Sequence, residues 1–416
     1  MNIQIISNLL GKKKKIQEVI FPVLDVSLNG VNYFFHIFVS WYLIPNDYGR
    51  LNSLLSLISI LTVIGVSFQT YTAKYISKGK DDEITLKGIF NCSILCFILF
   101  MCCMLIFSPL IIKTTKSDFI SIIIIIFILG SNIILSVIRG IFQGNKSFFM
   151  LNISFYIEVV TKIIVLFLLL KNNRSIHSAL LSILFGMVFS LIHGIYAARG
   201  FFYKKQKGNI PKTIVKKVTN IYVTNFFFNF FTSIDMIMVN YYLPQSSGIF
   251  AVVLKYNQLL SFASSSIFTV FIPLLTERIC DKKKFNKGIK NLFLIMLAVS
   301  TLTLIFYKFI MPYTVTMFFG KEYAQAKGYL FIGIISYIFL SFIFIIINIY
   351  MIIEKWMHFI TLSVAAVLFV IIIALFHRSI SSIIYIEIIF YAVLFLMLLI
   401  GVFVKDLRQK GEINDD

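Results

Sequence analysis

The sequence predicts an all-α protein that crosses a lipid bilayer many times. The chain is 59% hydrophobic and only 13% charged, and its mean hydropathy is +0.91. This charge content is too low for a surface that faces water on all sides. The apolar residues form runs of about 20, the length of a helix that crosses a hydrocarbon core ~30 Å thick. Helices are expected because lipid offers no partner for exposed backbone groups.

Twelve runs are long enough to cross the bilayer. The first follows the basic cluster Lys12–Lys15 and lacks a small-residue cleavage site, so it is interpreted as a membrane helix rather than a signal peptide. The connections are short, which excludes an inserted soluble domain. The predicted spans are 18–43, 51–73, 88–112, 119–142, 148–170, 177–202, 218–243, 247–275, 288–312, 326–352, 357–376 and 380–404.

The basic residues predict the orientation of the chain. Segments on the same side as the N-terminus hold most of the lysines and arginines, as cytoplasmic segments do. Both termini are therefore predicted to be cytoplasmic. The basic loop 203–217 divides the chain into an N-terminal six-helix lobe, 1–202, and a C-terminal six-helix lobe, 218–416. These loops account for most of the net charge of +20, so no nucleic-acid partner is expected.

An internal repeat supports this division. Residues 39–49, VSWYLIPNDYG, return as VNYYLPQSSG at residues 239–248. The copies lie six spans apart and must point the same way across the membrane, which predicts a pseudo-two-fold axis along the membrane normal. A weaker echo joins residues 142–152 to residues 351–361, since both follow the fourth span of their half.

A polar stripe precedes the first copy of the repeat. Its residues are spaced by three or four, which puts them on one face of the first span. They are Asp25, Asn29, Asn32, His36 and Ser40.

The seventh span repeats the stripe with Asn225, Asn229, Thr232 and Asn240, and Asp235 lies close to the position of His36. A polar cavity is the favoured interpretation, because unpaired polar groups are costly in lipid. Hydrogen bonding between packed helices is the alternative.

Isolated charges in other spans are further candidates for a binding site. Glu158 and Lys162 lie one turn apart in the fifth span and can neutralise each other. Arg139 lies near the end of the fourth span, where its side chain can reach the membrane surface. Ser182, Gly186, Ser190 and His193 share a face of the sixth span that is typical of close helix packing.

Lys255, in the eighth span, has no carboxylate one turn away. It needs a partner from another helix or an anion. Asp25 and Asp235 are the acidic residues that could supply one.

The sequence contains no sign of a metal site or a catalytic centre. Cys92, Cys96, Cys102 and Cys103 lie in one apolar run without His or carboxylate neighbours, which excludes a disulfide framework or a zinc site. The HExxH motif, the P-loop and the Gly-x-Ser-x-Gly elbow are absent. No catalytic residue, metal or cofactor is therefore predicted.

Several stretches resemble polysaccharide-exporter and O-antigen flippase proteins of the multidrug/oligosaccharidyl-lipid/polysaccharide exporter superfamily. Residues 41–78, from WYLIPNDYGRLN onward, are similar to the start of these proteins, and residues 232–279 to their seventh and eighth spans. MFFGKEYAQAKGYL at 317–330 resembles the loop before their tenth span, and residues 138–152 their fourth-to-fifth connection.

The resemblance implies two six-helix lobes with a MATE-like fold around a central cavity that opens to each side in turn. It implies transfer of undecaprenyl-pyrophosphate-linked oligosaccharide across the bacterial inner membrane, as in O-antigen, lipopolysaccharide or capsule synthesis. The expected partners are this substrate, membrane lipids, and a polysaccharide polymerase with its chain-length regulator. The pyrophosphate suits Lys255, Lys162 or Arg139, and the sugars suit Asn29, Asn32, Asn225 and Asn229.

Two other functions stay open. A cation-coupled drug exporter of the same superfamily would use a carboxylate such as Asp25 or Asp235 to bind H+ or Na+, although Lys255 and the amide-rich stripes speak against it. An enzyme is the third alternative. A polymerase needs a large periplasmic loop, and none exceeds roughly 15 residues. An acyltransferase needs a catalytic histidine, and His36 has no evident partner set.

Overall fold

The computed structural model describes residue 28 and residues 30–77, 86–202, 212–279, 281–352 and 358–412. The described residues are predominantly helical and form no strands. Residues 30–42 are helical. The helices that follow are α2 (Pro45–Ser77), α3 (Leu86–Ile106), α4 (Ser108–Thr115), α5 (Phe119–Gly144), α6 (Phe148–Asn172), α7 (Ile176–Phe202), α8 (Lys212–Phe231), α9 (Ile234–Tyr242), α10 (Ser247–Glu277), α11 (Lys282–Phe309), α12 (Met311–Phe318), α13 (Lys327–Ile352), α14 (His358–Leu375) and α15 (Ile380–Glu412), with 3-10 turns η1 (Pro244–Ser246) and η2 (Lys321–Ala326).

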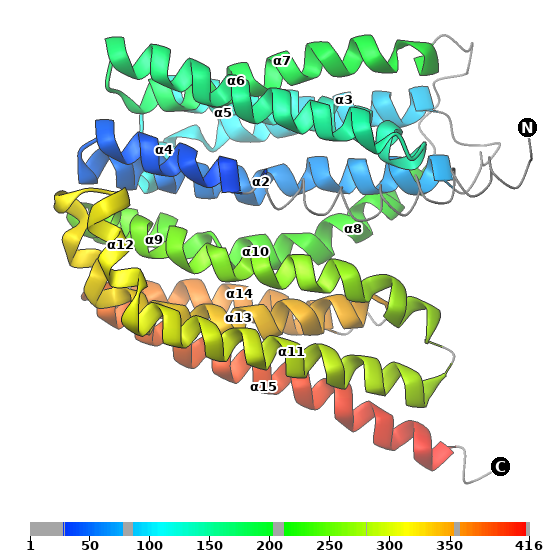
Figure 1. The fold of residues 1–416 in the computed structure, drawn as a ribbon. Coiled ribbons are helices and arrows are strands. Elements are labelled where there is room, and N and C mark those ends of the chain that lie inside the picture. The colour runs from blue at the N-terminus through cyan, green and yellow to red at the C-terminus, as the bar shows by residue number, and fades with distance from the viewer. Residues whose placement is uncertain are drawn as a thin grey trace, which may run out of the picture. The chain divides into compact units, whose positions relative to one another are not determined.

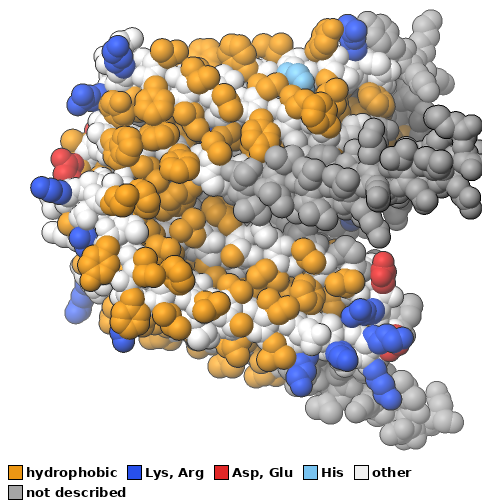
Figure 2. Space-filling view, in the orientation of Figure 1, with side chains coloured by type: hydrophobic (Ala, Val, Ile, Leu, Met, Phe, Trp, Pro, Cys, Tyr) orange, Lys and Arg blue, Asp and Glu red, His pale blue; other side chains and the backbone are white. Residues whose placement is uncertain are grey.

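Nine helices in the described part of the chain are long and apolar enough to cross a membrane. The other three predicted spans correspond to residues 30–42, to the pair α8 and α9, and to the shorter apolar helix α14. Figure 2 shows hydrophobic side chains along the helices, with Lys and Arg near the helix ends. The prediction of an all-α polytopic membrane protein is confirmed.

The helices form two compact units. The first contains 64–108 and 119–221 together with the described residues up to Tyr42. In it α6 packs along α7, α7 along α5, and α5 against α3, as Figure 1 shows. Its core includes Phe68 and Tyr71 of α2 and Ile133 of α5.

The second unit contains 43–63, 109–118 and the described residues from Tyr222 onward. In it α13 packs against α15, α10 and α11 (Figure 1). Phe268, Leu292 and Ile345 lie in its core. The long helix α2 contributes its first part to this unit and its second part to the first unit, so the two units share a continuous helix.

The fold extends the internal repeat beyond the residues that revealed it in the sequence. Helix α3 is followed by the eight-residue helix α4, and α11 by the eight-residue helix α12. Pro109 and Pro312 occupy the second position of these short helices, where a missing backbone N–H costs nothing. The third span of each half therefore ends in the same way, with a break where a continuous helix was predicted.

The two repeated segments, 39–49 and 239–248, each form a turn between helices. Pro45 begins α2, and Pro244 begins the 3-10 turn before α10. The turns contact each other: a Cβ on Gly248 would lie 2.0 Å from the Pro45 carbonyl oxygen, and one on Gly49 would lie 2.7 Å from the Gly248 nitrogen. Only residues without a Cβ permit this approach, so the repeated glycines serve a contact between the two copies.

Candidate functional site

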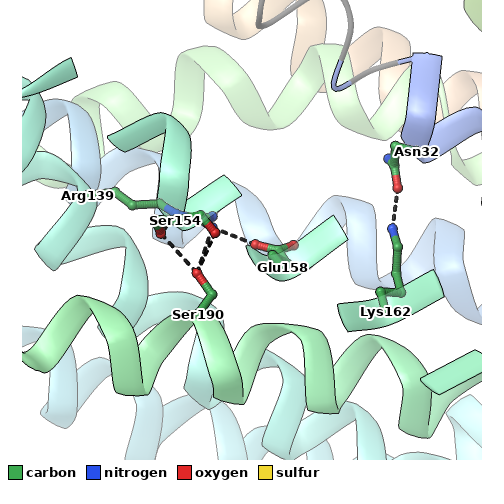
Figure 3. A network of polar contacts seen from close by, with 6 residues as sticks. All are labelled: Asn32, Arg139, Ser154, Glu158, Lys162 and Ser190. Carbon is green, nitrogen blue, oxygen red and sulfur yellow. Dashed lines mark hydrogen bonds and ion pairs between the residues drawn. The ribbon is translucent and has the colours of Figure 1, made fainter. Parts of the chain in front are cut away.

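In the first unit, a polar network joins α5, α6 and α7 around Arg139 (Figure 3). Arg139 is buried, with its side chain 6% exposed. Its Nε donates to Ser154 Oγ at 3.0 Å, and its Nη2 donates to Glu158 Oε2 at 2.6 Å. Nη2 also lies 3.2 Å from Ser154 O and 3.3 Å from Ser190 Oγ. Charge-assisted bonds of this kind are the strong ones, so this network connects three helices.

The close approach of α6 and α7 makes the network possible. A Cβ on Gly186 would lie 2.6 Å from the Glu158 carbonyl oxygen. Ser190 donates to the Ser154 carbonyl oxygen at 2.6 Å. Ser182 is buried on the same helix. The predicted close packing by the small residues of the sixth span is therefore confirmed.

Of the two predictions about these charges, the one for Glu158 holds only in part, and the one for Arg139 is wrong. Glu158 forms its contact ion pair with Arg139, while its charge acts on Lys162 without a contact ion pair. Arg139 does not reach toward the membrane surface, because its guanidinium is buried and lies 3.9 Å from the centre of the Phe155 ring. The sequence could not show that α5 and α6 pack with these two charges face to face.

Lys162 lies one turn beyond Glu158 on α6 and is 7% exposed. Its ammonium donates to Asn32 Oδ1 and lies 4.7 Å from the centre of the Phe35 ring. Neither partner carries a negative charge. Lys162 is therefore a buried cation whose contact partners are an amide and an aromatic ring.

The first polar stripe is only partly visible. Asp25 and Asn29 lie outside the described residues. Asn32 contacts Lys162, and Ser40 donates to the Ile37 carbonyl oxygen at 2.7 Å. His36 is half-buried, and its ring lies 5.3 Å from that of Phe35. The structure thus brings Asn32 and Lys162 together, with His36 one turn away from Asn32.

In the second unit, the predicted seventh span is two helices rather than one. Helix α8 ends at Phe231 and α9 begins at Ile234. Tyr391 donates to the Phe231 carbonyl oxygen at 2.8 Å and Tyr337 to the Thr232 carbonyl oxygen at 3.4 Å. These hydroxyls satisfy backbone acceptors that the break exposes, as lipid requires.

The break separates the members of the second stripe. Asn225 and Asn229 lie on α8, where Asn229 donates to the Asn225 carbonyl oxygen at 3.0 Å and accepts from Ser59 at 3.4 Å. Asn240 lies on α9 and donates to the Thr115 carbonyl oxygen at 2.7 Å. The asparagines of α8 and α9 therefore do not continue one helical face.

Asp235 follows the break at the start of α9 and is 0% exposed. Its Oδ1 accepts from the Met236 backbone N–H at 2.7 Å, and its Oδ2 has no hydrogen-bond partner. Lys255 donates to Gln258 at 3.1 Å, and its charge acts on Asp235 without a contact ion pair. Lys255 and Asp235 therefore attract each other by charge, as predicted, but do not form a contact ion pair.

Sequence reasoning missed Glu387. This residue of α15 is buried; Oε2 accepts from Ser336 at 3.1 Å, and Oε1 has no hydrogen-bond partner. Its charge and that of Asp235 act on each other. A signal was present, since Glu387 interrupts the apolar run IIYIEIIF. The second unit thus holds two buried carboxylates, each with an unsatisfied oxygen.

Comparisons with known proteins agree with this architecture. A family model described as "Polysaccharide biosynthesis protein" matches residues 20–279. No curated protein sequence matches the chain.

Solved structures of low sequence identity share the fold. An inward-facing multidrug resistance MATE family transporter of the MOP superfamily aligns with a TM-score of 0.70 at 12% identity, covering 92% of this chain and 98% of that one. The lipid II flippase MurJ in an inward closed conformation aligns with a TM-score of 0.69 at 15% identity, covering 92% and 87%. The multidrug transporter DinF-BH aligns with a TM-score of 0.68 at 12% identity, covering 92% and 93%.

Proposed function

Because the chain belongs to the polysaccharide biosynthesis protein family, we propose that it is a flippase for undecaprenyl-pyrophosphate-linked oligosaccharide. It moves an O-antigen or capsule repeat unit across the bacterial inner membrane by alternating access. Both termini lie in the cytoplasm, and a polysaccharide polymerase with its chain-length regulator receives the product on the other side. The protein performs no covalent chemistry on the substrate.

The observation that carries this proposal is the state of Lys162. A buried cation without a charged contact partner is costly, and a pyrophosphate offers it the charge-assisted hydrogen bonds it lacks. Asn32 accepts a hydrogen bond from Lys162. Its amide can give up this bond and form one with a sugar hydroxyl instead. In the second unit, Asn225, Asn229 and Lys255 are the residues proposed to contact the substrate.

The test compares two lysines of helix α6. Lys162→Met removes the buried ammonium, while Lys171→Met removes an exposed one near the end of the same helix. In cells that depend on this protein for surface polysaccharide, Lys162→Met is expected to abolish display at an unchanged membrane level, and Lys171→Met to preserve it. Normal display with Lys162→Met would remove Lys162 from the substrate site.

A cation-coupled multidrug exporter is the second candidate, and the buried carboxylates favour it. Asp235 and Glu387 each have an oxygen without a hydrogen-bond partner, and a proton or Na+ would satisfy such groups. The same pair can couple a flippase to H+ or Na+. Proteoliposomes separate the candidates: a flippase moves labelled lipid-linked oligosaccharide and leaves ethidium unmoved, whereas a drug exporter expels ethidium when a gradient of either cation is imposed.

A further inference from the structure

Glu158 lies between two buried cations and contacts only one of them. On one side it meets Arg139 Nη2 at 2.6 Å. On the other, Lys162 lies four residues along α6, a spacing at which a carboxylate and an ammonium can pair. Figure 3 shows Glu158 directed to Arg139, while the Lys162 ammonium is directed to Asn32.

The contacts of Arg139 hold it in this orientation. Nε donates to Ser154 Oγ, Nη2 is shared among Ser154 O, Ser190 Oγ and Glu158, and the Phe155 ring packs against the guanidinium. The planar guanidinium fixes the directions of its donors. Its contacts with α6 and α7 therefore determine where the Glu158 carboxylate lies.

We propose that Arg139 is a positioning residue that holds the Glu158 carboxylate away from Lys162 and so keeps the Lys162 ammonium available to an anionic lipid headgroup. This inference rests on the proposed function, in which Lys162 contacts the pyrophosphate. Without Arg139, Glu158 becomes a half-buried carboxylate without a contacting cation, and Lys162 is the cation one turn away. The new pair occupies Lys162, and the site loses its attraction for an anion.

The proposal separates Arg139 from the residues that touch substrate. Arg139 directs its described hydrogen bonds to Ser154, Glu158 and Ser190, and acts on the headgroup through Glu158. A role limited to connecting α5, α6 and α7 makes a different prediction, because the loss of Arg139 then lowers stability and binding of any lipid together.

Binding to purified protein in nanodiscs tests the proposal, with undecaprenyl pyrophosphate as the probe and undecaprenol as its uncharged counterpart, both detected by native mass spectrometry. Arg139→Leu is expected to weaken binding of undecaprenyl pyrophosphate at least tenfold and to leave undecaprenol unchanged. Arg139→Leu with Glu158→Gln restores binding, because no carboxylate remains to occupy Lys162. Ser182→Ala, which removes a buried hydroxyl of α7 outside the network, is the matched control and binds as the parent protein does.

Three further variants test whether Arg139 positions Glu158. Arg139→Lys retains a cation for Glu158 and is expected to retain binding; if Arg139→Leu does not fold, a loss of binding in folded Arg139→Lys overturns the proposal. A double variant that folds normally and still binds weakly overturns it as well. Lys162→Met distinguishes failure of the proposed function from failure of the positioning role. Normal binding of undecaprenyl pyrophosphate by Lys162→Met contradicts the proposed function. Weak binding by Lys162→Met together with normal binding by Arg139→Leu contradicts only the positioning role of Arg139.

Discussion

The contact between the two repeated turns predicts a large effect of a single methyl group. In Gly248→Ala, the new Cβ would lie 2.0 Å from the carbonyl oxygen of Pro45, where ordinary contact begins at 3.4 Å. The obstacle is backbone, 2.6 Å from the new atom at Pro45 C, so a rotamer change cannot relieve it. The turns must therefore move apart by more than an ångström.

Two effects of this substitution oppose each other. Alanine is favoured over glycine in a helix by up to about 1 kcal/mol, and Gly248 is the second residue of α10. Overpacking against a rigid partner costs about 1–3 kcal/mol and sometimes more. The clash is severe, so the upper part of this range applies, and the net loss is about 2 kcal/mol.

Thermal unfolding of purified protein in detergent measures this loss. Gly248→Ala is expected to lower Tm by a few degrees, since about 1 kcal/mol shifts Tm by ~2–4 °C in domains of 150–250 residues. Gly328→Ala is the control, because Gly328 is also the second residue of a helix and a Cβ there meets nothing within 4 Å. Equal Tm values for the two variants would refute the argument that the turns depend on glycine at this contact.

Three other substitutions test other parts of the structure. Tyr391→Phe leaves the Phe231 carbonyl oxygen without its hydroxyl donor, which costs about 1–3 kcal/mol and is measurable as a lower Tm; an unchanged Tm would show that the helix break does not need this bond. Lys255→Ala is expected to stop surface polysaccharide display while the protein stays in the membrane, and normal display would remove Lys255 from the site. Asp281 caps α11, and its hydrogen bond with Lys284 lowers the pKa of its carboxyl. The stability that this cap contributes is therefore complete above the ordinary carboxyl pKa and is lost as the pH falls through the lowered pKa. The stability of Asp281→Asn should fall less steeply with acid than that of the parent protein below pH ~4. Identical plots of stability against pH for the two proteins would contradict this.

Nine of the predicted spans match helices of the described chain that are long and apolar enough to cross a membrane. The sequence reveals them because lipid imposes a length and an apolar composition on each helix. The repeat was visible because each turn has a proline at its start and glycine where the two copies touch. Pro45 begins α2, and Pro244 begins η1 before α10. The short helices α4 and α12 were merged with the spans before them, because Phe107 and Ile310 are as apolar as their neighbours and periodicity does not mark the break.

The polar groups were found more easily than their partners. The sequence identifies Glu158 as a charged residue within a span. That it forms its contact ion pair with Arg139 and not with Lys162 depends on how α5 packs on α6, and the pattern of a single helix does not reveal this packing. The break after Phe231 is stabilised by Tyr337 and Tyr391, more than a hundred residues away in the sequence. Such long-range partners explain why the stripe of the seventh span appeared continuous.

Flipping in proteoliposomes tests the central claim most directly. Undecaprenyl-pyrophosphate-linked oligosaccharide with a reducible fluorescent label is reconstituted with the purified protein, a membrane-impermeant reductant is added outside, and H+ and Na+ gradients are applied in parallel. The account predicts that nearly all of the label becomes accessible, compared with about half in protein-free vesicles and in vesicles that carry Lys162→Met. Protection of the inner half in the presence of the parent protein, under every gradient, would contradict it.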